Sequence, residues 1–177
     1  NWRENAYGIF LNNGVIKTFP WKACFGKGFF AFVTNQCSRV MEKMVRWGVM
    51  SVGKIKKILV PVDGSVNGCK AVDEAIFLAQ KCKAEMDFVY VASNINKDIP
   101  SHIVFDRIWE KLPEEVKAER HVETGNIPKA ILRVAESENS DIIIMGSRGL
   151  GLFKGALIGS VSQKVVEESK IPVMVIK

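Results

Sequence analysis

Apolar residues recur in two alternating patterns from Lys56 to the end of the chain. Short, almost wholly apolar runs are typical of strands that are buried on both faces. Between these runs, apolar positions three and four residues apart indicate helices that each bury one face. The predicted strands are 57–62, 86–92, 120–124, 141–145 and 171–176. The predicted helices are 65–83, which the turn Asp63-Gly64-Ser65 starts, 101–118, 128–135 and one that starts at 160. Ser101 can cap the second helix, and Pro113 offers an earlier end for it.

Strands that alternate with helices predict an α/β fold, a doubly wound and mostly parallel five-stranded sheet with helices on both faces. Ligands of such sheets bind beyond the carboxyl ends of the strands. The turn at Asp63 follows the first strand, and the loop that starts at Gly146 follows the fourth. We therefore expect these two segments to meet at one edge of the sheet, although they are far apart in the sequence.

The loop after the fourth strand is rich in glycine, at Gly146, Gly149, Gly151, Gly155 and Gly159. Glycine lets a backbone approach a ligand closely, and the helix that follows offers unpaired N–H groups to an anion. The segment has no GxxxxGK[ST] motif, and Lys154 stands where a dinucleotide fingerprint needs its third glycine. A phosphate-binding loop is thus the prediction, and a purely structural turn is the alternative.

The spacing G-x2-G-x9-G-[ST], formed by Gly146, Gly149, Gly159 and Ser160, resembles the nucleotide loop of the universal stress protein (UspA) family. Three other segments resemble the same family: KKILVPVDGS at 56–65, TGNIPKAILRVAE at 124–136 and SVSQKVVEESKIPVMVIK at 160–177. The resemblance covers residues 54–177. It implies an adenine-nucleotide alpha hydrolase-like sheet with strand order 3-2-1-4-5. It also implies the ATP-binding subclass, because the glycine loop is retained.

The resemblance implies a site for ATP, with Mg²⁺ or Mn²⁺, that is made by Asp63, Val91, Gly146, Gly149, Gly159, Ser160 and Val161. Asp63 and Val91 would contact the adenosine, and the glycines and Ser160 would cradle the phosphates. Val161 would add a backbone N–H group. The chemistry of the residues is consistent with this assignment, since Ser160 can both cap its helix and donate to a phosphate.

Some of these residues have structural alternatives. Asp63 could cap the first helix instead of contacting a nucleotide. Arg148 and Lys154 could pair with phosphate charge, or they could lie on a solvated loop surface. His102 and His121 are isolated from any triad-like sequence context, and no residue is placed as a base for an attacking water. We therefore name no catalytic residue and expect at most slow ATP hydrolysis.

The first 53 residues differ from the rest. They contain three of the four Trp and six of the ten Phe, and they have a net charge of +5, whereas the remainder has +1. We predict that residues 1–53 form a poorly ordered or non-native extension and that residues 54–177 form a universal stress protein domain. A basic aromatic arm that touches a membrane surface or RNA is the alternative for the extension. The nearly neutral remainder argues against general binding of nucleic acid.

The four cysteines show no CxxC spacing, which predicts reduced thiols in a cytoplasmic protein without a metal site. No run of about 18 apolar residues predicts a membrane span. The apolar terminal strand 171–177 predicts a homodimer, because such an exposed edge tends to pair. The predicted function is that of an ATP-binding, nucleotide-responsive regulatory module. A nucleotide-free dimeric scaffold and an adenylate-using enzyme are the alternatives.

Overall fold

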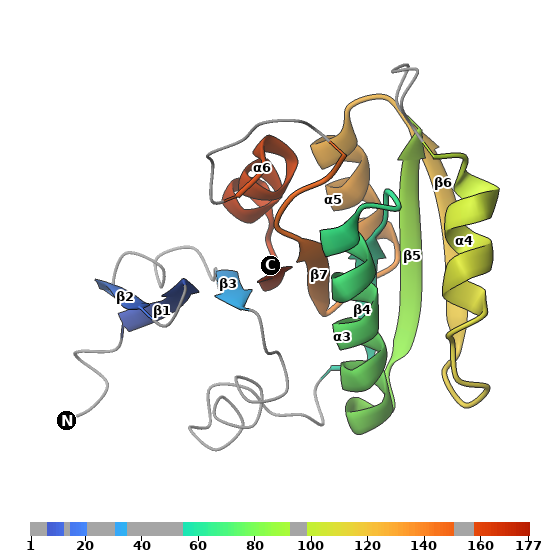
Figure 1. The fold of residues 1–177 in the computed structure, drawn as a ribbon, viewed down its shortest axis with the longest axis horizontal. Helices are drawn as coiled ribbons and strands as arrows, with labels where there is room; N and C mark the ends of the chain where they lie inside the picture. The colour runs from blue at the N-terminus through green and yellow to red at the C-terminus, as the bar shows by residue number, and fades with distance from the viewer. Residues whose placement is uncertain (1–6, 13–14, 21–30, 35–54, 93–98, 151–157) are drawn as a thin grey trace.

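The computed structural model describes residues 7–12, 15–20, 31–34, 55–92, 99–150 and 158–177. Its centre is a sheet of six parallel strands in the order β3-β8-β7-β4-β5-β6 (Figure 1). These strands are β3 Ala31–Thr34, β4 Lys57–Pro61, β5 Glu85–Ala92, β6 Ala118–Thr124, β7 Ile142–Gly146 and β8 Val173–Ile176. A separate antiparallel pair consists of β1 Tyr7–Asn12 and β2 Val15–Pro20.

The five strands from β4 to β8 have the order 3-2-1-4-5 when they are numbered along the chain, which confirms the predicted sheet. Their apolar runs are buried on both faces. In β4, Ile58 and Val60 belong to one core cluster, whereas Leu59 between them belongs to the other, and all three are fully buried. This alternation explains why the strand is apolar throughout.

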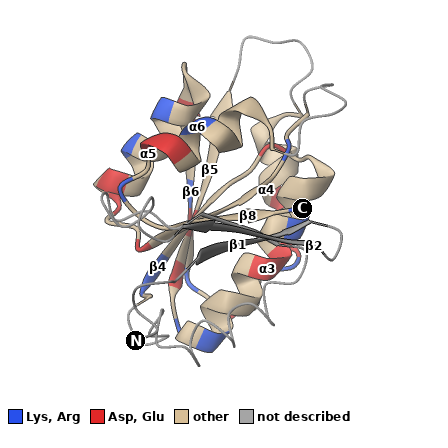
Figure 2. Ribbon diagram, turned by 90° about the vertical axis from the view of Figure 1, so that its left-hand side faces the viewer, with Lys and Arg blue, Asp and Glu red and all other residues tan. Residues whose placement is uncertain are grey.

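Helices cover both faces of the sheet (Figure 2). Helices α3 Val66–Cys82 and α4 Ser101–Trp109 pack on one face, and α5 Ile127–Ser137 and α6 Ser160–Glu168 pack on the other. Each pair of helices contributes apolar side chains to one core cluster, together with the strand residues that face it. None of the described helices has the length and apolarity needed to span a bilayer.

The starts of α3 and α5 have side-chain caps. The Oγ atom of Ser65 accepts a hydrogen bond from the Gly68 amide at 3.1 Å, and Oδ1 of Asn126 accepts one from the Lys129 amide at 3.2 Å. Pro128 lies in the first turn of α5, as predicted, where its missing N–H group costs no hydrogen bond. These caps fix where the chain leaves the carboxyl edge of the sheet and enters each helix.

The predicted helix 101–118 is too long, because α4 ends at Trp109. A helical Pro113 would place its ring against the carbonyl of Trp109, four residues earlier, so the helix stops there. Strand β6 then begins at Ala118, two residues before the predicted start. The expected capping by Ser101 is also wrong, since Pro100 holds the cap position and makes no side-chain hydrogen bond.

Strand β3 lies along the outer edge of β8. Residues 31–34 pair in parallel with residues 173–176. This pairing occupies the edge that the sequence analysis assigned to a second copy of the chain. The remainder of residues 1–53, apart from β1 and β2, lies outside the described residues, so the division of the chain at residue 54 stays a prediction.

Asp87 on β5 is the one buried charged side chain in the described ranges, with 1% of its surface exposed. The Nζ atom of Lys57 lies 3.2 Å from its Oδ2 atom. Partial burial would lower the pKa of the Lys57 ammonium, but hydrogen bonding and charge from Glu138 and Asp87 outweigh this effect and raise that pKa. Lys57 is therefore a stable cation beside the buried carboxylate.

Candidate functional site

The turn after β4 and the loop after β7 meet at the carboxyl edge of the sheet, as the sequence predicted. The amide of Leu150 donates a hydrogen bond to Oδ2 of Asp63 at 3.2 Å. The hydroxyl of Ser65 donates to the carbonyl of Arg148 at 3.2 Å. Parallel strands deliver both loops to the same edge, because all their carboxyl ends point the same way.

Asp63 links these two loops and does not cap α3. Its Oδ1 atom accepts a hydrogen bond from the Ser65 amide at 2.9 Å, and its Oδ2 atom accepts the bond from Leu150. The cap of α3 is Ser65, so the capping alternative for Asp63 is wrong. Each carboxylate oxygen has two lone pairs, which leaves Asp63 able to accept further hydrogen bonds from a ligand.

Two of the predicted glycines lie too close to other groups to carry a Cβ atom without a shift. A Cβ atom on Gly149 would lie 2.5 Å from Oδ2 of Asp63. One on Gly146 would lie 2.7 Å from the backbone carbonyl carbon of Asn67, at the start of α3. Gly159 is less crowded, because a Cβ atom added there would lie 3.3 Å from the carbonyl oxygen of Ser147. The loop is therefore closely packed against the β4–α3 connection at its first two glycines.

Ser147 fixes both ends of the loop and was missed by the sequence analysis. Its amide donates to the Ile176 carbonyl at 2.6 Å, and its carbonyl accepts from the Gly159 amide at 2.7 Å. Its hydroxyl accepts a hydrogen bond from Nδ2 of Asn67 at 3.1 Å. No sequence signal distinguishes this serine, because its partners come from three separate segments. The bonds place the start of α6 beside the end of β7.

The amino end of α6 has no side-chain cap. Gly159 holds the cap position, and Ser160 is the first helical residue and is exposed, so the prediction that Ser160 caps the helix is wrong. No acidic residue lies in the first turn. The first amides of a helix have no partner within the helix and carry partial positive charge. This end of α6 can therefore accept an anion.

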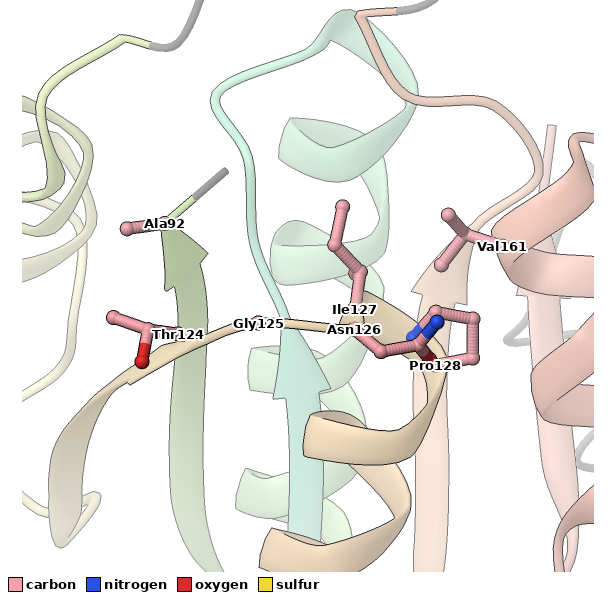
Figure 3. Close-up of a pocket in the computed structure, with 7 residues that line it drawn as sticks. All are labelled: Ala92, Thr124, Gly125, Asn126, Ile127, Pro128 and Val161. Atoms are coloured by element: carbon pink, nitrogen blue, oxygen red, sulfur yellow. The ribbon is translucent and has the colours of Figure 1, made fainter. Parts of the chain in front are cut away.

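A cavity of about 540 Å³ lies beside this helix end (Figure 3). It is lined by Val161 of α6, by Ala92 and Thr124 at the ends of β5 and β6, and by residues 125–128, which run from the turn after β6 into the first turn of α5. In the close-up, Val161 and Ala92 lie on opposite sides of that turn. Cavities of this size are typical of small-molecule sites. The arrangement can accommodate a small ligand that carries an anionic group.

The site residues missed by the sequence analysis include this turn. Thr124 is the last residue of β6 and Gly125 follows it, at the same end of the sheet as Asp63 after β4, and Gly125 has a φ of +95°. That position in a parallel sheet was the signal that could have identified them. Among the predicted site residues that the structure describes, Val161 is the one that lines this cavity.

The remaining predicted residues that the structure describes are not part of the cavity lining. Val91 is partly buried on the face covered by α5 and α6, next to Ala92. Arg148 is exposed in the loop after β7. Lys154 and the rest of residues 151–157 lie outside the described residues.

Comparisons with known proteins by family model, by sequence and by structure all indicate the same family. The model of the universal stress protein family matches residues 54–104 and 108–177. Universal stress protein YxiE of Bacillus subtilis is 30% identical over 145 residues, which cover 68% of this chain and 98% of YxiE. The structure of MJ0577 of Methanocaldococcus jannaschii has a TM-score of 0.60 and 28% identity, over 70% of this chain and 96% of that one.

A universal stress protein family protein of Arabidopsis thaliana, At3g01520, was solved with AMP bound. Its TM-score is 0.52 at 22% identity, over 69% of this chain and 91% of that one, which shows a shared fold. The family model matches well over half of the chain, and both the sheet order and the relatives agree with it. The chain therefore belongs to the universal stress protein family.

Proposed function

We propose that residues 54–177 bind ATP, together with Mg²⁺ or Mn²⁺, at the carboxyl edge of the sheet and act as a nucleotide-responsive regulatory module. The observation that carries this proposal is the uncapped amino end of α6 beside a cavity of about 540 Å³. A structural relative with AMP bound supports an adenine nucleotide as the ligand class. The preference for ATP rests on the retained glycine spacing.

The cavity and the helix end offer different chemistry to the two parts of the nucleotide. Ile127 and Val161 give the cavity apolar walls for the adenosine. The amides of the first turn of α6 attract phosphate oxygens, because the helix dipole places partial positive charge there. Arg148 adds a charged group in the adjoining loop. The nucleotide is thus expected to lie with its phosphates toward α6.

The regulatory part of the proposal follows from the bond between Asp63 and Leu150. A nucleotide that contacts Asp63 and the loop after β7 adds contacts across the same junction, which this bond, the Ser65–Arg148 bond and the Asn67–Ser147 bond already join. A ligand that binds only the folded state stabilises it by mass action. The nucleotide concentration would then determine how firmly the two loops are held together.

Ser160→Asp tests the role of the helix end. The carboxylate would repel the phosphates and lower the ATP affinity at least about tenfold, which is ~1.4 kcal/mol. The same charge interacts favourably with the helix dipole, so the melting temperature of the free protein should stay the same or rise. Isothermal titration calorimetry with ATP and Mg²⁺, together with thermal melts, measures both quantities.

Ser160→Asn is the matched control, because it has the same shape as the aspartate variant without the charge. It should bind ATP within about threefold of the unmodified chain, well below the tenfold loss above. Equal ATP affinity in the aspartate and asparagine variants would show that no phosphate lies at the start of α6. Absence of ATP binding in the unmodified chain would overturn the proposed function itself.

The homodimer through residues 171–177 is part of the same proposal, with a condition. β8 pairs with β3 along its outer edge, so a second copy can use that edge only when β3 leaves it. Along β3, every second backbone N–H group points toward β8 and donates to it. Proline has no N–H group, so at one of the adjacent positions 32 and 33 it removes a hydrogen bond between β3 and β8, and at the other it does not. Phe32→Pro and Val33→Pro therefore form a matched pair.

Sedimentation velocity across micromolar concentrations measures the result. One of the two proline variants should form more dimer than the unmodified chain, and the other should resemble it. If both variants remain monomeric at every concentration, the edge of β8 does not mediate dimerisation.

A further inference from the structure

A second cluster of polar side chains lies at the opposite edge of the sheet, near the amino ends of the strands. Asp87 comes from β5, Glu119 and His121 come from β6, and Glu138 follows the end of α5. One carboxylate oxygen or imidazole nitrogen of each residue lies within 4.8 Å of those of the other three. Three adjacent structural elements thus direct metal-ligand atoms to one place.

The buried member of the cluster has unused binding capacity. Asp87 is 1% exposed, and the Lys57 ammonium is the one partner of its Oδ2 atom among the described residues. The Lys57 ammonium faces that atom as an ion pair at 3.2 Å. The Oδ1 atom lies 3.2 Å from Nε2 of His121. Buried carboxylates generally have their charge balanced by a donor or a metal ion, so the place that the ammonium holds beside the Oδ2 atom is one that a metal ion can take.

The charges of the cluster are not balanced. Lys57 also lies 3.2 Å from Oε2 of Glu138, so one ammonium pairs with two of the three carboxylates of the cluster, and Glu119 is the third. With a neutral imidazole, two negative charges remain without a partner inside the cluster. A divalent cation in place of the ammonium would reduce this excess. Lys57 can leave, because its long flexible side chain is 24% exposed and an ammonium is well hydrated in water.

We propose that Asp87, Glu119, His121 and Glu138 bind a divalent transition-metal cation of the Zn²⁺ class, which replaces the Lys57 ammonium. Imidazole nitrogen together with carboxylate oxygen is a common ligand set for Zn²⁺. Zinc ligands lie about 2.0–2.2 Å from the ion, so the ligand atoms must move closer together by about an ångström or two. Glu119 is exposed and Glu138 is partly exposed, which leaves both side chains free to make that movement.

The site would be structural. The ion would connect β5 and β6 to the end of α5, and a cation that binds only the folded chain stabilises it. It would be separate from any metal bound with a nucleotide, because the two sites lie at opposite ends of the strands. Binding is therefore expected in the absence of nucleotide.

Co²⁺ is the probe for this site, added to the reduced, nucleotide-free full chain. One equivalent should give the visible d–d absorption of cobalt with nitrogen and oxygen ligands, and Zn²⁺ should displace it. Zn²⁺ should also raise the melting temperature. His121→Ala should weaken Zn²⁺ binding at least about tenfold in calorimetry. Lys57→Met should strengthen it, because the competing ammonium is gone.

His102→Ala is the matched control, since it removes the other histidine of the chain, which is exposed on α4. It should leave Zn²⁺ affinity unchanged. A sulfur-to-cobalt charge-transfer band would assign the ion to a cysteine and overturn the proposal. Equal affinity in His121→Ala and the unmodified chain, or no saturable Co²⁺ absorption, would also overturn it.

Discussion

Replacing Gly149 by valine (Gly149→Val) is expected to lower the ATP affinity by about a hundredfold or more, which is ~2.7 kcal/mol. Even a Cβ atom at this position would lie 2.5 Å from Oδ2 of Asp63. Either the carboxylate or the loop must therefore move, and the Leu150–Asp63 hydrogen bond would be lost with that movement. The Asp63 carboxylate and the loop after β7 both belong to the proposed nucleotide site, so their movement should weaken ATP binding. Calorimetric titration with ATP measures this loss of affinity.

Leu150→Val is the control for this prediction. It places the same side chain one residue later, at a position that is 39% exposed and already carries a larger apolar group. Its ATP affinity should match that of the unmodified chain. If Gly149→Val binds ATP as well as Leu150→Val does, the loop after β7 is not part of the nucleotide site.

The second large effect is expected on folding. Replacing Gly146 by alanine (Gly146→Ala) should lower the free energy of unfolding by about 3 kcal/mol, the upper part of the range for overpacked cores. The added Cβ atom would lie 2.7 Å from the Asn67 carbonyl carbon and 2.8 Å from the Gly68 amide nitrogen. These are backbone atoms of a packed helix, so they cannot move aside as a flexible side chain could. Urea denaturation measures the change.

Gly159→Ala is the matched substitution, because its closest contact is with the Ser147 carbonyl oxygen at 3.3 Å. It should cost about 1 kcal/mol or less, the usual effect of alanine at a helix cap position. If Gly159→Ala destabilised the chain more than Gly146→Ala, the conclusion that β7 packs closely against the start of α3 would be wrong.

The sheet could be predicted because its signals are local. A strand such as β4, buried on both faces, must be apolar along its whole length, and the helices between strands must be apolar on one face. Helix ends were harder to predict. The stop at Trp109 depends on Pro113, whose effect on the helix competes with an apolar pattern that continues past it. The cap at Ser65 was indicated by the sequence, whereas the one expected at Ser101 was not formed.

The meeting of the glycine loop with the turn after β4 could be predicted for a related reason. The glycine spacing is a local pattern, and it placed Gly146, Gly149 and Gly159 in the loop that meets the turn after β4. Ser147 and the turn at 124–128 carry no comparable pattern. Their roles depend on partners from other strands, which a single sequence does not identify.

The order of strands and helices, the apolar core and the glycine loop were determined by the sequence itself, because each depends on residue spacing within one segment. Only the tertiary structure decided that Asp63 bonds to the amide of Leu150 and that β3 covers the edge of β8. It likewise brought Asp87, His121 and Glu138 together from β5, β6 and the end of α5. These contacts join segments that are distant in the chain, and they form only when the parallel strands align side by side in one register.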